Sequence, residues 1–278
     1  RPTHPGLCGP SFCSPVGGRA RSAGWRAFFA GVATGAAAGS ASTAGKPRAV
    51  LLPVDPGLGN GWANLHTARK TATPIINIVG DHATHHQHFE TPLASDIATV
   101  ARNVSTFVVA PTTPAEVGPA AAASVAAAST PPGEVATLVL AADASWGEGA
   151  APAPPQVAAA PVPVGADTVS AIAAVLASGE PVALLVGGRA CRADALMAAS
   201  RVAKTTGAKL LCGTFPGRLG RGAGVAPVGG PAYPAEQAPV QRGGPWHPLA
   251  LGRGRPGELL PLPRKRGRPG ASAAAGRT

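Results

Sequence analysis

Short apolar runs alternate with longer runs of helical periodicity along most of this chain, and this alternation limits the folds available to it. In the first half, strands are predicted over residues 48–54, 74–79, 106–109 and 134–140, and helices over 28–44, 60–72, 94–104 and 114–128. Strands that alternate with helices of about ten to fifteen residues form parallel, doubly wound sheets. The pattern therefore predicts an α/β fold.

Two details of the first helices are also predicted. Gly31, Gly35 and Gly39 recur at every fourth position, so they share one helix face and permit very close packing there. Asn60 stands directly before the next helical run, where its side chain is predicted to cap that helix.

A proline- and alanine-rich segment divides the chain. Residues 149–166 read GAAPAPPQVAAAPVPVGA, a composition typical of an extended, semi-rigid linker. A second alternation follows it, with helices predicted over 168–177 and 194–206, strands over 181–186 and 209–212, and Gly207 at a helix C-terminus. The chain is therefore predicted to hold two doubly wound units with parallel sheets, residues 28–148 and 167–238.

The flanks differ from the middle in charge and in pattern. The formal net charge is +11, but residues 55–238 carry ten basic and twelve acidic residues, so the basic excess lies wholly in the flanks. Residues 1–27 and 239–278 lack periodicity and are predicted to be disordered or translated out of frame. RGRP at 253–256 and 266–269 resembles an AT-hook, so the alternative function is a basic nucleic-acid-binding protein whose tail binds weakly and with salt dependence.

Several classes of protein are disfavoured by the sequence. No run of about 18 apolar residues occurs, so no membrane span is predicted. No C-x-x-C pair occurs, and Cys191 and Cys212 fall in apolar runs as buried thiols, which is typical of a reducing compartment. An intracellular, cytoplasmic location is expected. An organellar location is the alternative, because the acid-free start contains Arg and Ser as transit peptides do.

Four segments stand in an order that carries more information than any one of them. They are FFAGVATGAAAGSASTAGKP at 28–47, DPGLGNGWANLHTARKTATPIINIVGDHATHH at 55–86, HFETPLASDIATVARNVSTFVV at 88–109, and GEPVALLVGGRA followed by GAKLLCGTFPGRLGRGAG between 179 and 224. Together they resemble the acetolactate synthase branch of the thiamine-diphosphate-dependent enzymes, over roughly residues 28–238.

This resemblance implies a fold and a chemistry. Residues 28–148 would be a partial pyrimidine-binding domain of the large subunit, and residues 167–238 part of the Rossmann-like central domain, which binds a flavin in some members. The family's third domain binds Mg²⁺ and diphosphate. The implied reaction is decarboxylation and carboligation of 2-keto acids with thiamine diphosphate, in a homo-oligomer such as a dimer.

The resemblance also assigns residues. Pro56, Gly57 and Asn60 match the family's G-P-G-x-x-N segment, His82 matches its G-D-H-A-T, and Glu90 its E-T-P, so these five are the expected cofactor-binding residues.

Three departures argue against activity in this chain. Ala30 occupies the position of the family's catalytic glutamate, so no catalytic residue is assigned. Asp55 replaces the first glycine of G-P-G. No G-D-G…N motif occurs, so the Mg²⁺ site is expected to be absent, and the chain is expected to be a truncated, inactive family member.

Two other features of the sequence could indicate different chemistry. His82, His85, His86 and His88 could bind a transition metal with Asp81 and Glu90, but two of these histidines already match the family loop, so no metal site is expected. Gly187 and Gly188 follow a strand without completing G-x-G-x-x-G, which favours packing at a strand end over a nucleotide turn.

Overall fold

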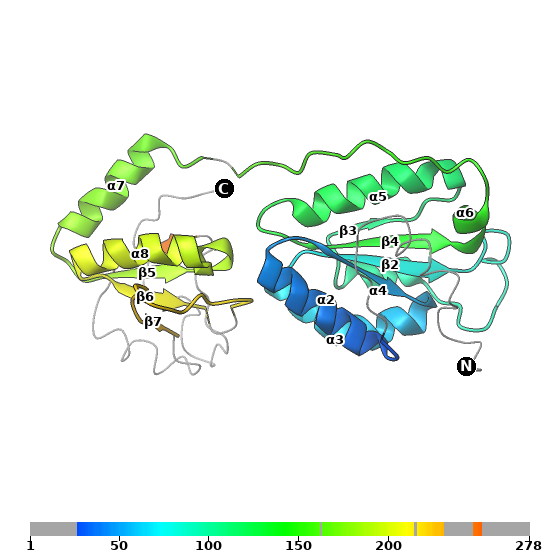
Figure 1. The fold of residues 1–278 in the computed structure, drawn as a ribbon, viewed down its shortest axis with the longest axis horizontal. Helices are drawn as coiled ribbons and strands as arrows, with labels where there is room; N and C mark the ends of the chain where they lie inside the picture. Colours follow the sequence, from blue (N-terminus) through cyan, green and yellow to red (C-terminus); the bar gives the residue numbers. More distant parts are fainter. Residues whose placement is uncertain (1–26, 162, 214–215, 231–246, 252–278) are drawn as a thin grey trace, which may run out of the picture. The chain divides into compact units, whose positions relative to one another are not determined.

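The computed structural model describes residues 27–161, 163–213, 216–230 and 247–251. The chain forms two compact units, Arg1–Ala160 and Pro161–Thr278 (Figure 1). Their boundary falls inside the predicted linker 149–166, whose described residues before Ala166 form neither helix nor strand. Among the described helices, none is long and apolar enough to cross a membrane.

Unit 1 is a four-stranded parallel sheet covered by helices on both sides (Figure 1). The strand order is β1-β2-β4-β3. The elements in chain order are α2 Ala30–Ala44, β1 Arg48–Leu52, α3 Val54–Lys70, β2 Ile75–Asp81, α4 Ile97–Arg102, β3 Phe107–Val109, α5 Pro114–Ser129, β4 Val135–Ala141 and α6 Ala142–Trp146.

Alternation along the strands divides the core of unit 1 between the two sheet faces. On one face, Val50, Leu52, Ile75 and Val79 are buried together with residues of α2, α3 and α4, among them Leu65. On the other face, Ile76 and Ala136 pack against Ala128 of α5, and Figure 1 shows α5 on the side of the sheet opposite α2 and α3. A parallel sheet buried on both faces explains why its strands read as nearly continuous apolar runs.

Helices α2 and α3 approach each other closely at glycines. A Cβ added at Gly61 would lie 2.7 Å from Cγ2 of Thr34, and one added at Gly35 would lie 3.4 Å from Nδ2 of Asn64. Asn64 Nδ2 also donates a hydrogen bond to the carbonyl oxygen of Gly31 at 2.6 Å. Gly31 and Gly35 thus use the close packing that their spacing predicts, whereas Gly39 has no atom within 4 Å of an added Cβ.

The start of α3 corrects the prediction for Asn60. The helix begins at Val54 with Pro53 as its N-cap, so Asn60 lies in the second turn, exposed, and caps nothing. The run PGLGNG contains three glycines and a proline, so its intrinsic propensity does not favour a helix. This part of α3 is stabilised instead by packing against α2 and the sheet, through the buried face that carries Leu58, Gly61 and Leu65.

Unit 2 is a second parallel sheet, with strand order β7-β6-β5-β8. Its elements are α7 Ala166–Ala177, β5 Val182–Val186, η1 Gly188–Cys191, α8 Ala193–Thr206, β6 Lys209–Cys212, β7 Val228–Gly229 and β8 His247–Leu251. Gly207 ends α8 with φ 71°, in the left-handed conformation that its position predicts. The two parallel α/β sheets confirm the predicted fold class.

Strand β8 corrects the expectation that residues 239–278 lack order throughout. It pairs in parallel with β5, with Val182 opposite His247 and Val186 opposite Leu251. Its five residues stand in a stretch rich in Pro, Gly and Arg, where no periodicity predicts a strand. The strand is defined instead by its backbone pairing with β5. The remainder of both predicted flanks lies almost wholly outside the described residues.

Candidate functional site

The carboxyl edge of the unit 1 sheet brings together segments that are distant in sequence. Because the strands are parallel, the connections that follow β1, β2 and β4 emerge at one edge, where α3 begins, residues 82–96 run and α6 begins (Figure 1). Residues 82–96 are called the edge loop below. Ligands of doubly wound sheets bind in the crevice outside this edge.

A strained turn joins β1 to α3. Val54 has φ 39°, in the left-handed region, which a β-branched residue adopts only at a steric cost. A Cβ added at Gly57 would lie 2.6 Å from Cδ of Pro53, so the turn also requires a glycine there. Such strain, about 1–3 kcal/mol per residue, persists where the surrounding fold enforces it and is concentrated at binding sites.

Asp55 follows this strained residue in the first turn of α3. Its Oδ2 accepts a hydrogen bond from the hydroxyl of Ser95 at the far end of the edge loop. Its Oδ1 is buried and has no hydrogen-bond partner. The position is electrostatically favourable for a carboxylate because the N-terminus of a helix carries partial positive charge.

The five expected cofactor-binding residues all belong to this edge or to the first turns of α3. Gly57 is buried, while Pro56 and Asn60 are exposed in α3. His82 is half-buried at the start of the edge loop, and Glu90 is exposed within it. Ala30 is the first residue of α2, half-buried, and packs against the apolar core, so its side chain brings no polar group to the site.

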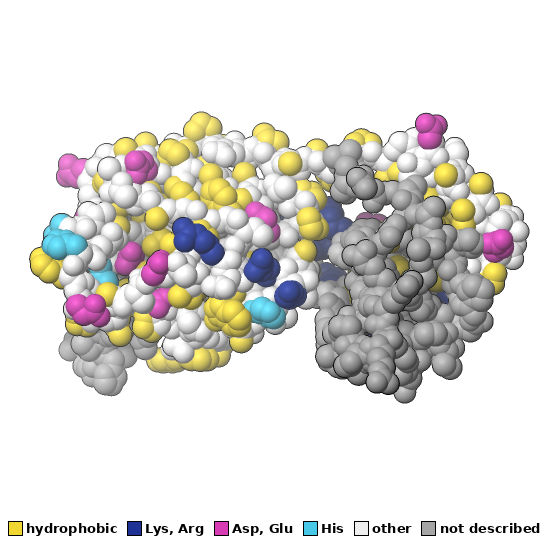
Figure 2. Space-filling model, turned by 180° about the vertical axis from the view of Figure 1, so that it is seen from behind, with side chains coloured by type: hydrophobic (Ala, Val, Ile, Leu, Met, Phe, Trp, Pro, Cys, Tyr) yellow, Lys and Arg dark blue, Asp and Glu magenta, His cyan; other side chains and the backbone are white. Residues whose placement is uncertain are grey.

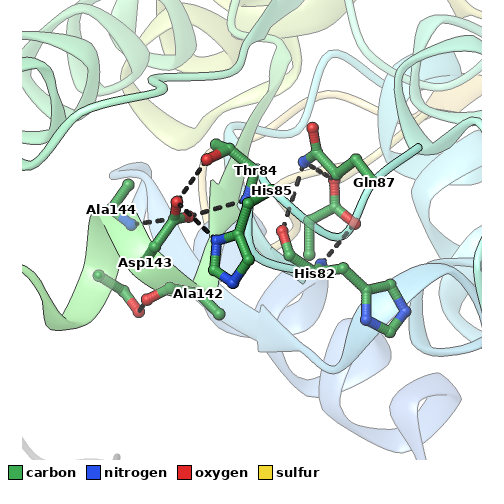
Figure 3. Close-up of polar contacts among 9 residues, drawn as sticks. His82, Thr84, His85, Gln87, Ala142, Asp143 and Ala144 are labelled. Carbon is green, nitrogen blue, oxygen red and sulfur yellow. Dashed lines mark hydrogen bonds and ion pairs between the residues drawn. The ribbon is translucent and has the colours of Figure 1, made fainter. Parts of the chain in front are cut away.

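Polar contacts hold the start of the edge loop (Figure 3). The backbone N–H of His82 donates to Oδ1 of Asp81 at 2.7 Å, and Nε2 of Gln87 donates to Oδ2 of the same carboxylate at 2.9 Å. Gln87 also donates to the carbonyl oxygen of His82 at 3.3 Å. Nε2 of His82 itself is buried without a hydrogen-bond partner.

Asp143, in the first turn of α6, fixes the next residues of the loop. Its carboxylate accepts from the backbone N–H of Thr84 at 3.0 Å and from the Thr84 hydroxyl. The Thr84 hydroxyl is the main reason that the pKa of Asp143 is lowered, followed by the Thr84 N–H. Nδ1 of His85 lies 3.9 Å from the carboxylate, in the arrangement that Figure 3 shows.

Charge is distributed unevenly over unit 1. Acidic and histidine side chains gather at one end of the face that Figure 2 shows, with Lys and Arg side chains farther along it. Asp55, Asp81 and Asp143 all belong to the carboxyl edge, whereas Arg69 and Lys70 lie in the last turn of α3. The carboxyl edge therefore presents an environment that favours ligand groups able to donate hydrogen bonds or carry positive charge.

The loop histidines do not assemble into a metal centre in the described part of the chain, where no three His, Cys, Asp or Glu side chains come together as such a site requires. The rings of His85 and His86 instead contact each other, with centroids 4.3 Å apart. His88 packs against Phe89, with centroids 3.8 Å apart.

Comparison with known proteins identifies relatives of this chain. The family described as "Thiamine pyrophosphate enzyme, N-terminal TPP binding domain" matches residues 29–101, which include Ala30, the strained turn and the edge loop. The chain is 46% identical over 263 residues to "Putative acetolactate synthase large subunit IlvX" of Mycobacterium tuberculosis. Residues 29–101 belong to the N-terminal domain family of the thiamine-diphosphate-dependent enzymes.

The extent of these similarities is partial. The alignment covers 94% of this chain, and so extends beyond residues 28–238, but only 50% of the relative, so the chain spans about half of that protein's length. The X-ray structure of a "putative thiamin diphosphate-dependent enzyme" from Mycobacterium smegmatis aligns with a TM-score of 0.62 at 25% identity, covering 68% of this chain and 37% of that one.

A second solved structure supports the fold alone. The thiamine diphosphate-dependent 4-hydroxybenzoylformate decarboxylase of Rhodococcus jostii aligns with a TM-score of 0.61 at 20% identity, again over 68% of this chain and 37% of its own. Both alignments show that the chain shares its α/β fold with part of these structures.

Sequence reasoning did not single out Asp143 or the Ser95 contact of Asp55. A signal for Asp143 was present, since an acid that follows a predicted parallel strand by a few residues is expected at the carboxyl edge. The Asp55–Ser95 contact joins residues 40 positions apart and could not be found without the fold.

Proposed function

We propose that the carboxyl edge of unit 1 binds the aminopyrimidine ring of thiamine diphosphate, and that this chain by itself does not convert 2-keto acids. The observation that carries the first part is the family match over residues 29–101, which falls on the strained turn and the edge loop. The second part rests on Ala30, which stands at the start of α2 without an acid.

The residues present fit one half of the cofactor. An aminopyrimidine carries ring nitrogens and an amine, and the edge offers it two buried polar atoms without partners, Oδ1 of Asp55 and Nε2 of His82. The ring would lie against three residues of α3, Pro56, Gly57 and Asn60. Glu90 of the edge loop would also contact it. When bound, thiamine diphosphate supplies the carbanion and the electron sink for decarboxylation and carboligation.

Loss of the acid at Ala30 should reduce turnover strongly. A positioned general acid or base typically contributes about 10²–10⁴-fold, and alanine neither donates nor accepts a proton. The sequence also contains no G-D-G…N motif, so we propose that Mg²⁺ and the diphosphate group are held by groups outside this chain. The assembly that we propose for the complete site is a homo-oligomer that acts on a small 2-keto acid.

The first prediction tests both parts. The chain is incubated with pyruvate, thiamine diphosphate and Mg²⁺, and acetolactate is measured against a control without protein. No acetolactate is expected above that control, while calorimetry should detect saturable, weak binding of the cofactor. Clear turnover would refute the proposed inactivity, and absence of saturable binding at millimolar cofactor would refute the proposed binding.

The nucleic-acid alternative rests on the basic tail. Both RGRP segments lie outside the described residues, so the structure adds nothing to them. Weak, salt-dependent binding to nucleic acid stays a prediction from charge alone.

A further inference from the structure

We propose that Asp55 is the acidic group that this chain presents to the aminopyrimidine ring, at a different position from the glutamate that Ala30 replaces. The inference rests on the proposed function, because it names the residue that recognises the ligand of that site. Asp55 would act in binding, as a hydrogen-bond acceptor for a ring N–H or for the exocyclic amine.

The first argument is the turn that presents the residue. Asp55 directly follows Val54, whose φ of 39° is unfavourable for a β-branched side chain. The turn is fixed by Pro53 and by the lack of a side chain at Gly57, whose added Cβ would lie 2.6 Å from Cδ of Pro53. The fold therefore holds Asp55 in a defined place at an energetic cost, which is the usual property of a ligand-binding turn.

The second argument is the state of its two oxygens. Ser95 donates to Oδ2, which fixes the orientation of the carboxylate, while Oδ1 is buried without a partner. A buried polar atom without a partner destabilises the protein, and nearly all such atoms in folded proteins are satisfied. An ionised carboxylate can only accept hydrogen bonds, so the missing partner is an N–H or O–H donor. The amine and a protonated ring nitrogen of an aminopyrimidine both meet that requirement.

The third argument is the position of the other unpartnered atoms. In the described residues, four buried side-chain polar atoms lack a partner, and three of them belong to this edge: Asp55 Oδ1, His82 Nε2 and Thr91 Oγ1. Leu52 pairs with Val79 in the β1–β2 register, so Asp55 and His82 each follow a paired residue by three positions. Both residues therefore follow the carboxyl ends of neighbouring parallel strands, at one edge of the sheet.

The fourth argument relates Asp55 to Ala30. Helices α2 and α3 leave the carboxyl edge together, and the Asn64–Gly31 hydrogen bond of 2.6 Å sets their register. Asp55 precedes Asn60 by five residues, or about 7.5 Å along α3, and the carbonyl oxygen of Asn60 lies near Gly31. Its carboxylate therefore belongs to the edge just beyond the start of α2. Relative to the family pattern, the chain lacks an acid at Ala30 and gains one at Asp55.

The second prediction uses thiamine as the probe, since it carries the aminopyrimidine ring without the diphosphate group. Its pyrimidine proton resonance is followed by NMR during titration with the full chain. Asp55→Asn keeps the size of the side chain and should weaken thiamine binding by about tenfold to a hundredfold, the usual contribution of a hydrogen bond to a charged group. Asp194→Asn, which changes an exposed acid in the first turn of α8, should leave binding unchanged.

A rescue experiment separates recognition from folding. If Asp55 provides the missing acid, then Ala30→Glu added to Asp55→Asn should restore thiamine binding, which a merely structural defect would not allow. Equal binding by the wild-type chain and Asp55→Asn would overturn the inference and leave the proposed function standing. Absence of binding by the wild-type chain and by Ala30→Glu alike would overturn the proposed function itself, and the inference with it.

Discussion

The two units share a parallel topology but differ in where they bury polar groups. Unit 1 buries six polar side chains among its described residues, Thr34, Thr73, Asn77, Ser105, Ser124 and Thr137, whereas the described part of unit 2 buries Ser200 alone. In unit 1, Asn77 donates to Thr137 at 3.2 Å, and Thr137 contacts Ser105 at 2.6 Å. The four unpartnered buried atoms of the described residues all belong to unit 1 as well. Burying polar groups is costly unless they are hydrogen-bonded, so the core of unit 1 depends on polar contacts as well as on apolar packing.

The helices that cover the two sheets also differ. In unit 1, α2 and α3 meet at Thr34, Gly61 and Asn64, where the backbones approach closely. In unit 2, α8 buries Leu196, Ala199 and Ala203 in an ordinary apolar stripe, and α7 has no fully buried residue. The close contact between α2 and α3 positions the start of both helices at the carboxyl edge. In unit 1, the residues of this helix contact therefore also determine the geometry of the candidate site.

The third prediction, with the largest expected effect, tests whether the units are separate. Leu65 in α3 and Leu196 in α8 are both fully buried. Leu65→Ala and Leu196→Ala should each destabilise the unit that contains them by about 2–5 kcal/mol, because each removes buried methyl groups and leaves a cavity. Hydrogen exchange measured by mass spectrometry should show the loss of protection within that unit. Equal loss in both units from either change would contradict the division.

The fourth prediction concerns the glycine contact that distinguishes unit 1. Gly61→Val would bring a Cβ to 2.7 Å from buried Thr34, so unit 1 should lose about 1–3 kcal/mol of stability through overpacking. Gly39→Val, on the exposed side of α2 with no atom within 4 Å, is the matched control and should leave stability unchanged or raise it by about 0.5 kcal/mol. Denaturant unfolding followed by circular dichroism measures both. A loss in Gly39→Val as large as that in Gly61→Val would refute the contact.

The fifth prediction, with the smallest expected effect, concerns the tether between α6 and the edge loop. The pKa of Asp143 lies below its usual 3.8, mainly because the Thr84 hydroxyl donates to it. The carboxylate therefore stabilises the loop above its usual pKa, and this contribution is lost as the pH falls through the lowered value. Asp143→Asn should make hydrogen exchange of the Thr84 amide several-fold faster at neutral pH. In this variant, the protection of that amide should no longer be lost as the pH falls through the lowered pKa of Asp143.

A matched change supplies the control for this tether. Asp194→Asn alters an acid in the first turn of a unit 2 helix and should leave exchange at Thr84 unaffected. Unchanged exchange in Asp143→Asn would show that other contacts hold the loop, such as those of Gln87 with Asp81 and His82.

The sequence predicted most of the regular structure but not its ends. Strands such as 134–140 and helices such as 114–128 were found within a residue or two, as β4 and α5. The six residues of α3 before Asn60 were missed, because two glycines and a proline there disfavour a helix that only tertiary packing stabilises. Helix α6 was missed because five residues show no periodicity, and β8 because only its partner strand β5 defines it.

By itself, the sequence determined the alternation of strands and helices and placed the boundary between the units within residues 149–166, since these depend on local pattern. The assignment of Ala30 to the position of the family's acid stays a prediction from residue identity. Only the tertiary structure decided that Asp55 directly follows a strained turn, with one carboxylate oxygen held by Ser95 and the other buried without a partner. The physical reason is that burial and hydrogen-bond satisfaction are properties of residues brought together across strands. No local pattern records which polar atoms the fold leaves without a partner.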